Sequence, residues 1–147
     1  MTGGAWVASA LDSWRALRAL VRTTLLFRLG GRRAVARATL AAVVPTARPD
    51  ALPVDEATVW RAYRAVRRAK RLWPFSVRCL QTALVLREVL TRRGLPAAVC
   101  LGVRLHNGKL EGHAWVEVGG WALDDARIWQ TFAALPVEQL RTKQVIA

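Results

Sequence analysis

The sequence predicts an α+β fold, with helices first and an antiparallel sheet after them. Up to about Arg93, apolar residues recur every three or four positions, which is the period of an amphipathic helix. After Pro96 the period becomes two, which is the period of a half-buried strand. Asn107-Gly108 and Gly119-Gly120 are hairpin-turn signals that divide this second part into three strands. Helices followed by an antiparallel meander are typical of the α+β class.

Residues 6–37 are expected to be helical, with an interruption at Gly30-Gly31. An apolar stripe runs along this segment: Trp14, Leu17, Val21, Leu25 and Leu29. Arg15, Arg18 and Arg22 lie on another face. A basic amphipathic helix can lie on a membrane or bind a protein, but we expect this one to pack on its own domain.

Residues 45–54 contain three prolines and predict a connector. It separates an N-terminal helical region, residues 1–50, from a core of residues 51–147. We expect the two regions to form one compact unit, because 147 residues suffice for one domain with its own core.

Two further helices are predicted before the sheet. Asp55 is a candidate N-cap for a helix over 56–72, which has an apolar stripe and a dense basic face that includes Lys70. Ser76 is a candidate N-cap for a second helix over 77–93. This second helix has a wide apolar face and is expected to be central, with Gly94 as its stop.

The strands are predicted over 97–105, 110–118 and 121–125, and the tail over 126–147 is expected to form a loop and a short helix. In the middle strand, alternation sets His113, Trp115 and Glu117 on one face. Ala114, Val116 and Val118 then lie on the other face.

The net charge of +13 indicates an acidic partner such as nucleic acid, an anionic membrane or an acidic peptide. An arginine-rich genome explains it equally well. A hydrophobic content of 53% argues against a disordered chain. There is no apolar run long enough to span a bilayer, no secretory signal is evident, and two cysteines are too few for a disulfide framework. We therefore expect the protein to be located in the reducing cytoplasm.

Cys79, His113 and Asp125 supply a thiol, an imidazole and a carboxylate, the three groups of a cysteine hydrolase. Cys79 falls in the first turn of its helix, where free N–H groups and the helix dipole favour a thiolate. Arg78 adds positive potential there. Taken alone, each of the three residues is also compatible with a purely structural role, and the hypothesis rests on their combination.

The identity of the acid is open between two neighbours. A two-residue turn at Gly119-Gly120 pairs His113 with a residue near 126, which brings Asp124 and Asp125 beside it. Alternation places only one of them on the face of His113, and a one-residue slip would exchange them. Trp115 shares that face, which suggests that it lines a substrate groove.

The other titratable candidates predict no chemistry. Cys100 lies in an apolar run and is expected to be an inert buried thiol. His106 directly precedes a turn and is expected to be exposed. The chain has no Cys-x-x-Cys pair for zinc, and we expect no metal and no cofactor.

The order Cys, His, Asp resembles that of the transglutaminase-like cysteine-protease superfamily. Four features resemble the lasso-peptide biosynthesis B protein family in its stand-alone form: Cys79-Leu80-Gln81, the helix ending Arg92-Arg93-Gly94, Gly102-Val103-Arg104 and, above all, His113-Ala114-Trp115-Val116-Glu117-Val118-Gly119-Gly120. The resemblance covers about residues 60–130. It implies a papain-like core, in which a central helix carries the cysteine and packs on an antiparallel sheet.

The resemblance also implies a function and site roles. Such a protein is a leader peptidase, which cleaves the leader from a ribosomally made lasso-peptide precursor. Cys79 would be the nucleophile and His113 the general base. The acid of the family lies twelve residues after the histidine, which is Asp125 here, and Asp124 stands where the family usually has Asn.

The implied partners are the precursor with its leader and core, a separate leader-recognition protein, and an ATP-dependent cyclase that closes the macrolactam. Two other hypotheses for the function remain open. One is acyl transfer on the same triad, with an amine in place of water. The other is a non-enzymatic basic module that binds nucleic acid or membrane, although no helix-turn-helix or RNA-binding motif is present and membrane contact is not favoured.

Overall fold

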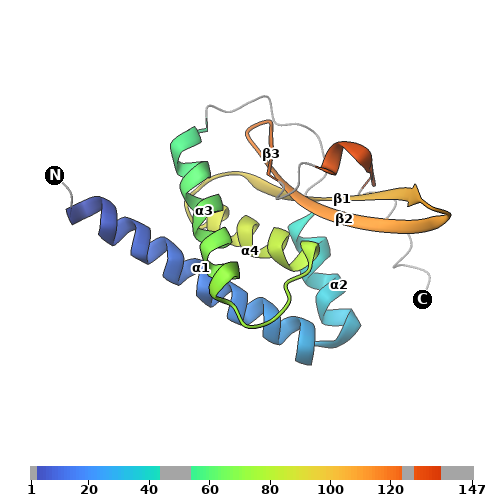
Figure 1. Ribbon diagram of the computed structural model, residues 1–147, viewed down its shortest axis with the longest axis horizontal. Helices are drawn as coiled ribbons and strands as arrows, with labels where there is room; N and C mark the ends of the chain where they lie inside the picture. Colours follow the sequence, from blue (N-terminus) through green and yellow to red (C-terminus); the bar gives the residue numbers. More distant parts are fainter. Residues whose placement is uncertain (1–2, 44–53, 124–127, 137–147) are drawn as a thin grey trace.

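The computed structural model describes residues 3–43, 54–123 and 128–136. Its elements are helices α1 (Gly3–Leu29), α2 (Gly31–Ala42), α3 (Glu56–Leu72) and α4 (Cys79–Thr91), strands β1 (Ala97–His106), β2 (Lys109–Val118), β3 (Trp121–Leu123) and β4 (Ala133–Ala134), and the 3₁₀ turn η1 (Ile128–Thr131). The four helices lie on one side of the sheet and η1 lies on the other (Figure 1). The predicted α+β class is confirmed.

The long N-terminal helix divides at the predicted glycine pair. Gly31 has a φ of 69°, a value that ends α-helical geometry without strain only for glycine. At Gly30, a Cβ atom would lie 2.6 Å from the carbonyl oxygen of Leu26. The predicted domain boundary near residue 50 lies outside the described residues, so that division stays a prediction. Side chains of α1 and α2 nevertheless share one hydrophobic core with α3, α4 and the sheet.

The helix α1 packs on its own domain as expected, but through a different face from the predicted stripe. The buried face is made of small or polar residues with one leucine: Asp12, Ala16, Ala19, Leu20, Thr23 and Thr24. Trp14, Val21, Leu25 and Leu29, which the periodicity grouped together, are exposed. Small side chains allow α1 to approach α3 and α4 closely, and the larger residues therefore remain on the outside.

The helix α3 has the start and the apolar stripe that its sequence predicts. The Asp55 side chain accepts hydrogen bonds from the backbone N–H of Ala57, at 3.2 Å, and from the Thr58 hydroxyl. The Thr58 bond is the main cause that lowers the pKa of Asp55. The apolar stripe of this helix is buried against the rest of the domain, and its buried members are Val59, Ala62, Ala65, Val66 and Ala69.

The start of α4 differs from the prediction. Arg78, and not Ser76, is the N-cap residue, and it makes no side-chain capping bond. Its extended backbone, with a ψ of 159°, delays the helix until Cys79. The helix is central as expected, with six buried residues and contacts to α1, α3, β1 and β2. After Thr91, Gly94 takes a φ of 75°, and the N–H of Leu95 donates back to Leu90.

The sheet is antiparallel in the order β3-β2-β1-β4. Asn107 and Gly108 both have positive φ values, of 50° and 73°, as a tight two-residue hairpin turn requires. The turn at Gly119-Gly120 also has two positive values. Ala114, Val116 and Val118 belong to the shared core, so the predicted alternation of β2 is confirmed. The two-residue strand β4 was not predicted and pairs with the outer edge of β1.

Candidate active site

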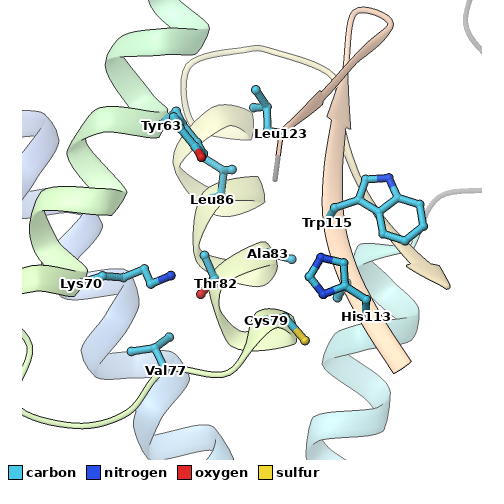
Figure 2. A pocket seen from close by; sticks show the side chains of 11 residues that line it. Tyr63, Lys70, Val77, Cys79, Thr82, Ala83, Leu86, His113, Trp115 and Leu123 are labelled. Carbon is cyan, nitrogen blue, oxygen red and sulfur yellow. The ribbon is translucent and has the colours of Figure 1, made fainter. Parts of the chain in front are cut away.

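A pocket of about 200 Å³ opens between α3, α4 and β2. Figure 2 shows the side chains that line it. They come from segments far apart in the sequence: Tyr63, Lys70, Val77, Cys79, Thr82, Ala83, Leu86, His113, Ala114, Trp115 and Leu123. The structure thus brings Cys79, His113 and Trp115, all predicted site residues, to a single pocket.

Cys79 is the first residue of α4 and is half-buried. The first intrahelical hydrogen bond runs from the N–H of Thr82 to the carbonyl of Arg78, at 2.9 Å. The N–H groups of Cys79, Leu80 and Gln81 therefore precede the hydrogen-bonded part of the helix. Their dipoles create positive potential around the thiol sulfur, and the same groups can donate to an oxyanion.

His113 lies on β2, and its ring is held by two aromatic neighbours. The Trp115 ring is 6.2 Å away, centroid to centroid, and is inclined by 23°, and the Phe132 ring is 5.0 Å away. The ring lies near Cys79, which lines the same pocket (Figure 2). Ala114 lines this pocket as well, although it lies on the other face of β2. The pocket therefore extends along the edge of β2 and is not confined to one face of the strand.

The aromatic neighbours are themselves held in place. Trp115 Nε1 donates to Glu117 Oε1 at 3.1 Å. The Arg104 guanidinium lies 4.5 Å from the centre of the Phe132 ring. It also donates hydrogen bonds to the Glu111 carboxylate, at 2.8 Å, and to the Thr131 hydroxyl, at 2.9 Å. These contacts hold the Trp115 and Phe132 rings in place, and the two rings in turn fix the orientation of the His113 ring.

Gly102 gives this arrangement its space, and replacing it should be costly. It pairs with His113, and a Cβ atom there would lie 2.9 Å from both the Phe132 Cβ and the Trp115 ring. We expect Gly102→Ala to destabilise the fold by about 1–3 kcal/mol through overpacking. Urea denaturation measures this, with Gly112→Ala as the matched control, because its nearest neighbour would be 4.0 Å away. Equal losses in both variants would contradict the packing argument.

Asp125 and its alternative Asp124 lie outside the described residues, so the choice between them stays a prediction. The part of the third strand that is described pairs Val116 with Leu123 and Val118 with Trp121. This is the register that a two-residue turn at Gly119-Gly120 requires, and the one on which the prediction relies.

Sequence reasoning missed two polar residues of the pocket, Tyr63 and Lys70. The sequence groups Lys70 with the dense basic face of its helix, but Lys70 is half-buried and its amine extends into the pocket (Figure 2). Tyr63 lies seven residues earlier, two turns away on the same face of α3. That spacing was the available signal, because the face that carries Tyr63 packs towards α4. Lys70 brings a cation into the pocket that contains Cys79.

Cys100 differs from Cys79 as expected. It is 5% exposed, and burial, assisted by the charge of Glu117 and a hydrogen bond to it, raises the pKa of Cys100 to about 12. His106 is exposed, also as expected.

The two thiols should react at very different rates. We expect iodoacetamide at pH 8 to modify the folded protein once, at Cys79, because Cys100 is buried and protonated at that pH. Peptide mass spectrometry gives the site, and a urea-unfolded sample, in which both cysteines should react, is the control. Equal labelling of both cysteines in the folded state would contradict the structure.

Within the described ranges, no three His, Cys, Asp or Glu side chains gather where they could hold a metal ion. None of the helices described here is both long and apolar enough to cross a membrane.

A comparison with models of protein families identifies one family that the sequence matches. The family model described as the transglutaminase-like superfamily matches residues 16–137, most of the chain. The match includes α4 with Cys79 and β2 with His113. No curated protein and no solved structure matches the sequence.

Proposed function

Because the chain belongs to the transglutaminase-like superfamily, we propose that it is a cysteine peptidase that removes the leader from a ribosomally made lasso-peptide precursor. Members of this superfamily are typically cysteine-dependent enzymes that act as proteases or acyltransferases. The observation that carries the proposal is the convergence of Cys79, at the start of α4, and His113, on β2, in one pocket.

The proposed reaction uses the thiol and the imidazole in sequence. His113 takes the proton of Cys79, and the thiolate attacks the carbonyl carbon of the bond between leader and core. The free N–H groups at the start of α4 donate to the oxyanion that forms. The C–N bond then breaks as imidazolium protonates the leaving amine, which becomes the N-terminus of the core. Water, deprotonated by His113, hydrolyses the thioester and releases the leader with a new carboxylate.

Two further residues have proposed roles. Asp125 would orient His113 and stabilise the imidazolium, as the acid does in other triads. Trp115 is 3% exposed, lines the pocket and lies beside the His113 ring, which supports a role in the substrate groove.

The lasso-peptide substrate rests on the sequence resemblance of the cysteine and histidine blocks. The proposed partners are the precursor, a separate leader-recognition protein that delivers the leader, and the ATP-dependent cyclase that uses the released N-terminus. The mechanism needs no metal and no cofactor.

The test is mass spectrometry of the cognate precursor after incubation with this protein and the recognition protein in water enriched in oxygen-18. We expect cleavage at one bond, with one heavy oxygen in the new leader carboxylate. Cys79→Ala should leave the precursor intact, whereas Cys100→Ala, the matched control, should cleave it.

The same experiment separates the alternatives. A leader joined to an added amine, without heavy oxygen, would indicate an acyltransferase with the same nucleophile. An intact precursor with every component folded would reject the peptidase and favour a non-enzymatic basic module.

A further inference from the structure

The outer face of α1 carries an apolar surface that the core does not use. Its members are large, apolar and between 39% and 79% exposed: Val7, Leu11, Trp14, Val21, Leu25 and Leu29. Spacings of three, four and seven residues place them on one side of the helix. We call these six residues the α1 stripe. The helix runs along the outside of the helical layer, and its N-terminal end extends beyond α3 (Figure 1).

Folding of the domain does not account for the stripe. Ala16, Ala19 and Leu20, which pack against the shared core, lie on the other side of α1. Single exposed apolar residues are ordinary, but the six from Val7 to Leu29 along one face of α1 form a patch about 33 Å long. Patches of this kind mark interaction surfaces. Among the side chains of α1 that the structure describes, none lines the Cys79 pocket, so the stripe is a separate feature.

Positive charge accompanies the stripe. Arg18 lies at its middle, one turn after Trp14 and three residues before Val21. A small groove beside it, between α1 and α4, is lined by four arginines and one glutamate: Arg15, Arg18, Arg22, Glu88 and Arg92. Glu88 accepts from Arg22 and Arg92, each at 3.0 Å, so one carboxylate serves two cations. The groove keeps an excess of positive charge.

We propose that the α1 stripe and its arginine groove form a docking surface for a partner protein that presents an acidic amphipathic helix. The apolar ridge of that helix packs along Leu11, Trp14, Val21 and Leu25, and its flanking carboxylates bind Arg18 and the groove. Trp and Arg at the centre of an interface are the residue types that most often dominate binding energy. Trp14 and Arg18 occupy that central position.

The positive charge of the arginines argues against two other occupants of this surface, a lipid bilayer and a second copy of the chain. A bilayer would have to accept the Arg18 guanidinium at the centre of the inserted apolar face, where desolvation of a charge is expensive. A second copy of this chain would bring Arg18 and Arg22 against their own equivalents, and like charges across an interface are strongly unfavourable. An acidic helix instead neutralises Arg18 and the excess positive charge of the groove while it covers the apolar surface.

The test uses a fluorescent four-heptad peptide with leucine at the a and d positions and glutamate at e and g. Its partner probe is the same peptide with lysine in place of every glutamate. Fluorescence anisotropy should show saturable binding of the acidic peptide to the wild-type protein and at least about tenfold weaker binding of the lysine peptide. The substitutions Leu25→Glu and Arg18→Glu should each weaken the binding of the acidic peptide at least about tenfold.

Matched controls separate the stripe from general charge and exposure. Leu72→Glu introduces the same change at an apolar residue of α3 that is 82% exposed, and Arg71→Glu reverses a neighbouring exposed charge. Both should bind the acidic peptide within about twofold of wild type. Equal weakening by stripe and control variants, or equal binding of the two peptides, would overturn the proposal.

Two further measurements test the other occupants. Sedimentation of wild-type protein onto vesicles of equal phosphatidylglycerol and phosphatidylcholine, abolished by Leu25→Glu while the acidic peptide fails to bind, would assign the surface to lipid. A wild-type dimer in analytical ultracentrifugation that Leu25→Glu dissociates would assign it to self-association. Either result would reject the acidic-helix proposal. All of these readouts are independent of peptidase activity.

Discussion

Cys79→Ala and His113→Ala are each expected to reduce kcat/KM for precursor cleavage by at least about 10³-fold, and the double variant should lose no more than the worse single variant. The reason is that the two side chains perform one proton transfer together. Without the imidazole the thiol is a poor nucleophile, and without the thiol the imidazole has no proton to accept. Their shared pocket makes this coupling possible.

The measurement is the initial rate of cleavage of a quenched-fluorescence precursor, with circular dichroism to confirm folding. His106→Ala is the matched histidine control, because this exposed side chain lies beside the hairpin turn and should leave the rate unchanged. Multiplicative losses in the double variant would show that the two residues act independently, and the proposed proton transfer would then be wrong.

Breaking the buried ion pair between Asp12 and Arg93 should cause the largest loss of stability. Asp12, on α1, is 3% exposed, and the Arg93 side chain, just beyond α4, is about 10% exposed. Burial lowers the pKa of Arg93, as expected for a cation removed from water. Asp12→Leu leaves that cation in the interior without its counter-charge, and we expect a loss of about 3 kcal/mol in the free energy of unfolding.

Urea denaturation of a double-mutant cycle tests this. Asp12→Leu combined with Arg93→Met should be less destabilised than Asp12→Leu alone, since an apolar pair replaces a stranded charge. Arg92→Met removes one cation of a surface pair with Glu88 and, as the neighbouring control, should change stability by less than about 1 kcal/mol. A loss below 1 kcal/mol for Asp12→Leu would mean that the pair contributes no more than a surface contact.

Local chemistry explains which elements could be predicted. Asp55 caps α3, Asn107-Gly108 closes the β1–β2 hairpin, and Gly30-Gly31 separates two helices, all as the sequence indicates. Each of these signals acts within a few residues of itself. The candidate site was predicted in part for the same reason, because Cys79 and His113 each occupy a recognisable local position.

The wrong or missing parts depend on partners distant in sequence. The periodicity of α1 contains two apolar faces, and only the small residues Ala16 and Ala19 reveal, once α3 and α4 are in place, which one is buried. Lys70 resembles its neighbouring arginines in sequence, yet the packing of α3 turns it towards the pocket. Ala133-Ala134 has no strand pattern, and it is the edge of β1 that makes it a strand.

The packing of α1 also has a consequence for synthesis on the ribosome. About sixty residues separate the end of α1 from the end of α4, which it needs as a packing surface. At ordinary translation rates, α1 waits roughly 3–12 s before α4 has been made. Until α3 and α4 have both been made, part of the face that α1 later buries stays exposed together with the α1 stripe. This helix therefore presents apolar surface to water for much of the time that the chain takes to be made.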